Sequence, residues 1–111
     1  MNAWLDTGNG KTYLTPRFAR EFPEVVRDRG TRATAVLRGV GGAASLDVVR
    51  IPEFTLLVAG SNLKLRQPEV LPAQSGVDHD AYHVWLGMDI FESARAVTID
   101  WKSMTVTVGI P

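Results

Sequence analysis

Turn-forming residues divide this chain into short stretches, and their spacing limits what the chain can fold into. Ten glycines and six prolines are spread over the 111 residues. Most runs between them are shorter than an average helix of about 11 residues. Several of these runs are rich in small and β-branched side chains, a pattern typical of short strands joined by turns. The sequence therefore predicts a mostly β fold.

Local signals place the individual elements. Thr15 followed by Pro16 is a typical helix start, and predicts a helix over residues 16–22, with a second short helical piece over 24–28. A further helical turn or two is expected over 89–94, with Asp89 as its N-cap. Strands are predicted at residues 33–38, 46–51, 54–58, 63–66, 83–86, 96–100 and 104–108. Residues 67–82 are predicted to form a loop, because they hold two prolines, a glycine and a polar run.

Two apolar tripeptides repeat the same local pattern. Ala3-Trp4-Leu5 leads into Asp6-Thr7-Gly8, and Val84-Trp85-Leu86 leads into Gly87-Met88-Asp89. Each is expected to be a strand that runs into a turn, with a helix after it. This repeat suggests two related halves within one domain.

The overall composition excludes several classes of protein. Twelve basic residues balance twelve acidic ones, which argues against a nucleic-acid-binding protein that depends on a strongly basic face. The absence of cysteine excludes disulfides, thiolate metal sites and a cysteine nucleophile. No apolar run approaches the ~20 residues that span a bilayer, and the N-terminus lacks the pattern of a signal peptide. We expect one domain over residues 1–111, with a cytoplasmic location by default.

Three candidate motifs fail on their context. Gly10-Lys11-Thr12 resembles the end of a phosphate-binding loop, but Leu5 stands where its first glycine is needed. The glycine-rich run at 39–44 fits a dinucleotide fingerprint, but a β-patterned segment follows it in place of a helix. Asp78, His79, Asp80 and His83 have metal-ligand chemistry, but the first three lie on a predicted loop, where the i, i+4 spacing of His79 and His83 has no special geometric value, and no further firmly placed ligand is found. We therefore expect no cofactor and no metal.

Asp6-Thr7-Gly8 has a more informative setting. A carboxylate at the end of a buried apolar strand is costly unless it is hydrogen-bonded or functional. Thr7 supplies a hydroxyl and Gly8 permits close approach of another backbone. Alone, the tripeptide is common enough to be an ordinary turn.

The order of motifs along the chain resembles the retropepsin-like, or retroviral-type, aspartic peptidases. Asp-Thr-Gly at 6–8 is followed by a glycine-rich hairpin, by Leu86-Gly87-Met88-Asp89, and by strands that end near Ile99-Asp100-Trp101. The resemblance spans nearly the whole chain. It implies a small closed acid-protease β-fold with one or two short helices, active as a homodimer.

The resemblance also implies roles for individual residues. Asp6, Thr7 and Gly8 would be catalytic, with the two Asp6 carboxylates of a dimer sharing one proton and activating a water. Asn9 would lie in the substrate cleft, and Gly39, Val40, Gly41 and Gly42 would form a flap over a peptide or unfolded-protein substrate. The family's usual arginine–acid brace is expected to be absent, because Met88 and Gly10 stand at its positions. The family also has a hairpin before Asp-Thr-Gly, whereas five residues precede Asp6 here, so we expect either that this sequence is a fragment of a longer protein or that its dimer is built differently.

Three interpretations remain open from the sequence. The first is a dimeric aspartic endopeptidase. The second is a catalytically silent retropepsin-like domain used for protein binding or assembly, suggested by Asn9 and the short N-terminus. The third is a β protein in which Asp-Thr-Gly is a chance turn. The separation of the two Asp6 carboxylates, and the position of Asp6 relative to the 39–42 hairpin, distinguish them.

Overall fold

The computed structural model describes residues 3–6, 8–39, 41–58, 61–73, 81–93, 96–100, 102 and 105–109, and its regular structure is mostly β. The strands are β1 (Ala3–Leu5), β2 (Tyr13–Leu14), β3 (Thr31–Gly39), β4 (Gly42–Arg50), β5 (Glu53–Val58), β6 (Ser61–Arg66), β7 (Glu69–Val70), β8 (Val84–Leu86), β9 (Ala96–Asp100) and β10 (Thr105–Gly109). The helices are α1 (Pro16–Glu21), α2 (Pro23–Arg29) and α3 (Ile90–Ser93). The three short helices in the described residues correspond to the segments predicted at 16–22, 24–28 and 89–94, whereas the family resemblance implied one or two.

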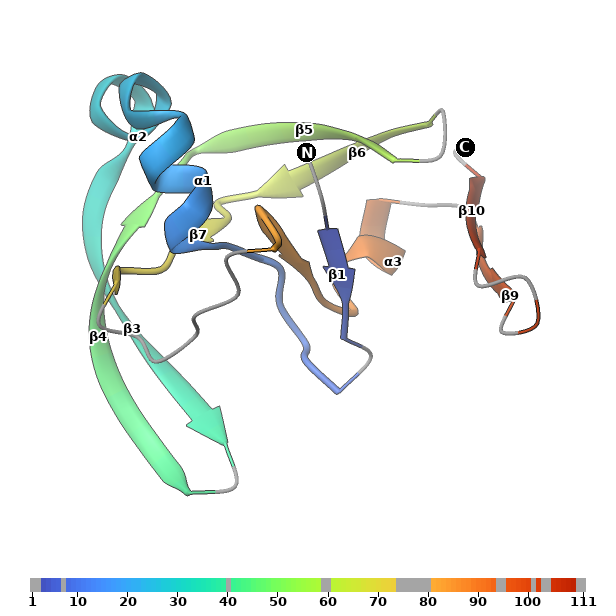
Figure 1. The fold of residues 1–111 in the computed structure, drawn as a ribbon, viewed down its shortest axis with the longest axis horizontal. Coiled ribbons are helices and arrows are strands. Elements are labelled where there is room, and N and C mark those ends of the chain that lie inside the picture. The colour runs from blue at the N-terminus through green and yellow to red at the C-terminus, as the bar shows by residue number, and fades with distance from the viewer. Residues whose placement is uncertain are drawn as a thin grey trace.

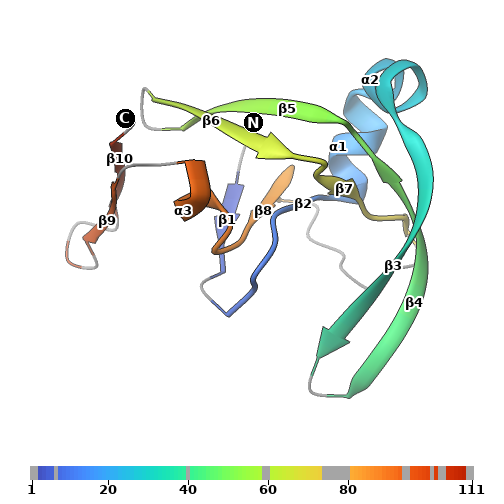
Figure 2. The same cartoon turned by 180° about the vertical axis from the view of Figure 1, so that it is seen from behind.

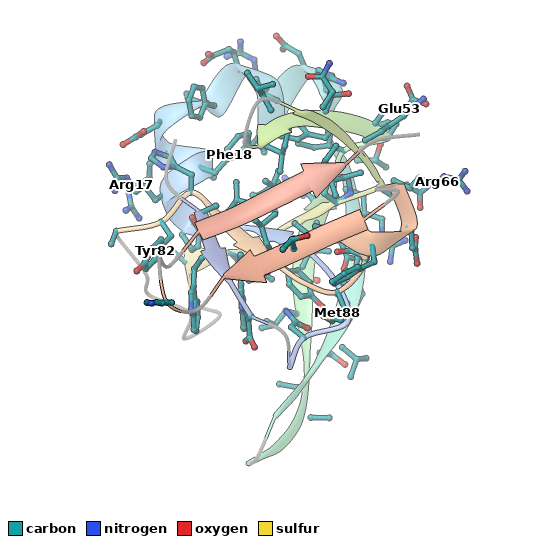
Figure 3. The ribbon with its side chains drawn as sticks, turned by 90° about the vertical axis from the view of Figure 1, so that its right-hand side faces the viewer. Arg17, Phe18, Glu53, Arg66, Tyr82 and Met88 are labelled. Carbon is teal, nitrogen blue, oxygen red and sulfur yellow. The ribbon has the colours of Figure 1, made fainter. Side chains whose placement is uncertain are left out.

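A six-stranded mixed sheet organises the fold, with the strand order β1-β8-β2-β7-β4-β3. The pairs β1–β8 and β2–β7 are parallel, and the other neighbours are antiparallel. Two separate hairpins, β5–β6 and β9–β10, complete the strands. Figures 1 and 2 show β9–β10 at one end of the molecule and the long β3–β4 hairpin at the other. Figure 3, seen from the side of β9–β10, shows that hairpin in front of the main sheet.

The predicted helix start is confirmed in detail. Thr15 is the N-cap of α1, where its side chain accepts a hydrogen bond from the Phe18 backbone N–H, and Pro16 occupies the first turn. Pro23 cannot continue α1 and instead begins α2. Phe18 is buried against Phe22 and Phe54, with ring centroids 5.1 and 5.5 Å away, so α1 is held on the core.

The loop predicted for residues 67–82 is interrupted by a strand. β7 pairs with β2 on one side and β4 on the other, with Val70 opposite both Leu14 and Val49. Both β2 and β7 are two residues long, too short to show an alternating pattern in sequence. Tertiary pairing therefore forms them, and together they join the halves of the sheet.

The core is formed by side chains from the main sheet, from the β5–β6 hairpin and from α1 and α3. Most of its members are aliphatic residues from strands that are far apart in sequence. Its larger cluster consists of Leu14, Phe18, Ile51, Leu56, Leu63, Leu65, Val70, Val84, Leu86 and Ile90. Because β2 and β8 both contribute to this cluster, core packing fixes the strands that carry the candidate site.

Candidate active site

The two apolar tripeptides noted in the sequence lie side by side. β1 and β8 pair in parallel with Ala3 opposite Val84, Trp4 opposite Trp85 and Leu5 opposite Leu86. Asp6 extends this pairing, because its N–H donates to the Leu86 carbonyl at 2.9 Å. The carbonyl of Asp6 then accepts from the Asn9 N–H at 3.2 Å and closes the turn. The predicted catalytic aspartate is therefore fixed at the end of a strand.

Each oxygen of the half-buried Asp6 carboxylate accepts a hydrogen bond. The Gly8 N–H donates to Oδ1 at 2.9 Å, and the indole Nε1–H of Trp85 donates to Oδ2 at 3.1 Å. A Cβ atom at Gly8 would stand 3.2 Å from Oδ1, so this position favours glycine for close approach. Thr7, the third predicted catalytic residue, lies outside the described residues.

Asn9 connects the two loops of the site through its backbone. Its carbonyl accepts from the Met88 N–H at 2.7 Å, which ties the turn after β1 to the turn after β8. Its side-chain Nδ2 is buried and has no acceptor within the described part of the chain. Gly87 approaches the segment between β1 and β2 closely, because a Cβ there would lie 2.8 Å from the Asn9 carbonyl oxygen and closer still to that of Lys11.

A buried hydroxyl and a carboxylate reinforce this junction. Thr12 is fully buried, and both its N–H and its Oγ1–H donate to Asp89, at 2.9 Å to Oδ2 and 2.5 Å to Oδ1. The same Oγ1 accepts from the Gly87 N–H at 3.0 Å. Asp89 does precede α3, as predicted for a cap, but these bonds direct its carboxylate to Thr12. The expected loss of a brace at Gly10 and Met88 is thus offset by a brace made of Thr12 and Asp89.

Glu69 is a buried carboxylate close to the segment between β1 and β2. Glu69 on β7 is 2% exposed and contacts Lys11 Nζ at 2.7 Å and Arg50 Nε at 3.0 Å. Burial, together with the negative charges of Glu69 and Asp89, raises the pKa of the neighbouring Tyr13 phenol above its usual 10.0. These groups hold the turn before β2 to β7 and β4.

The predicted flap residues belong to a long hairpin. β3 and β4 pair from Thr31–Arg50 to Gly39–Gly42, so a hairpin is confirmed at this position. Gly41 and Gly42 are exposed, and Gly42 has a φ of 115°, a conformation that favours glycine. Val40 lies outside the described residues. Figures 1 and 2 show the free end of this hairpin extending on the same side of the molecule as the turn that follows β1.

Trp85 and Thr12 are the site residues that sequence reasoning missed. The repeat of Ala3-Trp4-Leu5 and Val84-Trp85-Leu86 carried a signal for Trp85, since paired strands would place the two indoles together. Their rings do stack, with centroids 5.6 Å apart and planes 7° apart. Thr12 gave no such signal, because its partner Asp89 is 77 residues away.

Neither a metal centre nor a membrane-spanning helix is found in the described residues. They contain no group of three histidine, cysteine or acidic side chains that could hold a metal ion. Asp78, His79 and Asp80 lie outside them, and His83 is buried and paired with Glu21. Within the same part of the chain, each helix is too short or too polar to cross a bilayer.

A cleft of about 540 Å³ lies away from this turn, on the other part of the sheet. It is lined by apolar side chains of α1, α2, β4 and β7, with Arg32 and Asp47 among its polar residues. Asp6 is not among its lining residues. Asp6 therefore lies outside this cleft in the single chain.

Comparisons with known proteins identify the fold. No family model matches the chain, and no curated protein sequence matches it. Among solved structures, the chain is similar to the retroviral protease-like domain of Ddi1 from Leishmania major, with a TM-score of 0.54 and 18% sequence identity. The match covers 98% of this chain and 80% of that one. The chain therefore has a mostly β, retropepsin-like fold.

Proposed function

We propose that this protein is an aspartic endopeptidase, active as a homodimer in which the Asp6 carboxylates of two copies form the catalytic dyad. The observation that carries the proposal is the placement of Asp6. Its carboxylate stands at the end of β1, held by Gly8 and Trp85, within a retropepsin-like fold. Because the chain contains a single Asp-Thr-Gly, one copy supplies only half of a dyad.

The chemistry follows from two carboxylates at close range. Two such groups cannot both ionise cheaply, so the pair holds one proton between them. The ionised member takes a proton from a bound water, which attacks the scissile carbonyl, while the protonated member hydrogen-bonds to the carbonyl oxygen. The leaving amine then receives a proton from the dyad. In this proposal Thr7 and Gly8 hold the loop that carries Asp6, and Asn9 lies beside the cleft that binds the substrate.

The β3–β4 hairpin serves as the flap in this proposal. Gly39, Gly41 and Gly42 lie at the turn of this hairpin, where residues without a side chain permit close approach to a peptide backbone, and Val40 belongs to the same run in the sequence. The substrate is a peptide or an unfolded protein, bound in extended form as an added strand. Closure of the tip excludes water from the dyad, apart from the water that reacts.

The proposal is tested by comparing wild type with Asp6→Asn on an unfolded protein at mildly acidic pH. We expect cleavage by wild type and none by Asp6→Asn, while Asp28→Asn, the same chemical change on exposed α2, stays active. Activity per chain should rise with chain concentration as dimers form. Added Asp6→Asn chain should inhibit wild type, because mixed dimers hold only one Asp6. Equal cleavage by wild type and Asp6→Asn would contradict the proposal.

The alternative function is a silent domain that binds or assembles proteins without cleaving them. Asn9 favours it, since the family usually has alanine or serine at this position. Sedimentation of the wild type separates the two functions. An inactive chain that stays monomeric at high concentration supports the silent domain.

A further inference from the structure

We propose that Trp85 is a positioning residue for Asp6, and that its indole N–H sets the orientation of the catalytic carboxylate. This inference rests on the proposed peptidase function and adds a residue to it. It starts from the 3.1 Å hydrogen bond from Trp85 Nε1 to Asp6 Oδ2, which joins residues 79 positions apart.

The indole ring is itself held in place by its neighbours. Trp85 is half-buried, and its ring stacks on Trp4 with the planes 7° apart. The ring of Tyr13 packs against it at a centroid distance of 5.9 Å. Trp4 and Tyr13 come from β1 and β2, the two strands that flank β8 in the sheet. Because the indole is already held in one orientation, no side-chain entropy is lost when its N–H binds the carboxylate.

Trp85 and Gly8 together determine how the carboxylate is turned. A carboxylate on a single bond rotates freely, and a donor on one oxygen alone leaves its tilt adjustable. With Gly8 on Oδ1 and Trp85 on Oδ2, both oxygens are assigned to fixed donors. Each oxygen can accept a second hydrogen bond, so positions remain for the shared proton and the attacking water. The pair of donors therefore orients the group and leaves it free to react.

The decisive variant replaces Trp85 with benzothienylalanine, which keeps the shape of the ring and exchanges the N–H for sulfur. We expect kcat to fall about tenfold or more, with KM within about twofold, because the missing bond orients the reacting group and does not bind substrate. Trp85→Phe should show the same division between kcat and KM. The control places benzothienylalanine at Phe91, an exposed residue of α3, so that it carries the same unnatural side chain and leaves the Trp85 ring and its Nε1 in place. It should retain most of the wild-type kcat.

A second measurement does not depend on activity. The NMR signal of the Trp85 indole N–H proton is assigned as the signal lost in Trp85→Phe. It should move upfield in Asp6→Asn, because an amide oxygen is a weaker hydrogen-bond acceptor than a carboxylate oxygen and deshields the proton less. The indole signal of Trp4 should move less. An unchanged Trp85 signal would overturn the hydrogen bond, and wild-type kcat in the benzothienylalanine chain would overturn its catalytic role. Equal cleavage by wild type and Asp6→Asn refutes the proposed function, and the positioning role with it, even if the signal moves.

Discussion

The hydroxyl of Thr12 should be among the most costly single groups to remove from this protein. Thr12 is fully buried, and its Oγ1 donates to Asp89 and accepts from the Gly87 N–H. Thr12→Val keeps the side-chain shape but removes both bonds. A hydrogen bond to a charged group contributes about 1.5–3 kcal/mol, and a stranded buried donor costs about 1–3 kcal/mol. We therefore expect Thr12→Val to lower the free energy of unfolding by about 3–5 kcal/mol.

Thr12→Ser is the matched control, because it keeps the hydroxyl and loses one buried methyl, worth about 1 kcal/mol. Urea unfolding, followed by tryptophan fluorescence at one fixed chain concentration, measures both variants. A difference of about 3 kcal/mol between them corresponds to roughly 12–24 °C in Tm for a small domain. If Thr12→Val unfolds no more easily than Thr12→Ser, the hydrogen bonds of the Thr12 hydroxyl do not stabilise the fold.

Two further predictions concern the same junction. Gly87→Ala should lower the free energy of unfolding by about 1–3 kcal/mol or more, because its Cβ would press on the Asn9 and Lys11 carbonyls. The control is Gly10→Ala, whose Cβ meets open space. Equal unfolding midpoints for the two variants would refute the close approach at Gly87. The raised pKa of Tyr13 means that the folded state keeps the phenol protonated while the unfolded chain begins to ionise near pH 10.0, so this group's contribution to stability is lost as pH rises above that value. Tyr13→Phe should therefore lose less stability than wild type between about pH 8 and pH 11, and an identical loss in both proteins would contradict the assignment.

The local elements were predictable because their signals are local. A hydroxyl cap with proline at the first helical position fixed the start of α1, and the glycine-rich run at 39–42 placed the turn of the long hairpin. The repeated tripeptides even contained the parallel pair β1–β8, although their spacing alone did not show that the two strands touch.

What the sequence did not reveal depends on contacts between distant segments. β2 and β7 are two residues each, and they exist as strands only because β8 and β4 lie beside them. Asp89 directly precedes α3, so local preference favoured a cap, yet Thr12 offers its carboxylate two donors at once. Two hydrogen bonds from Thr12 to the Asp89 carboxylate contribute more than one capping bond to a four-residue helix would.

The pairing of β1 with β8 also has a consequence for how the protein is made. Gly8, the donor to Oδ1, is close to Asp6 in sequence, whereas Trp85, the donor to Oδ2, lies 79 positions away, so a long loop must close before this second bond forms. Such long-range contacts form late in folding, because the entropy of closing the loop opposes them until other contacts exist. During synthesis, the Oδ2 atom of Asp6 therefore has no donor until the residues of β8 have been made and have folded beside β1. The two segments that orient this carboxylate are thus made far apart in time, and the order of synthesis delays its final orientation.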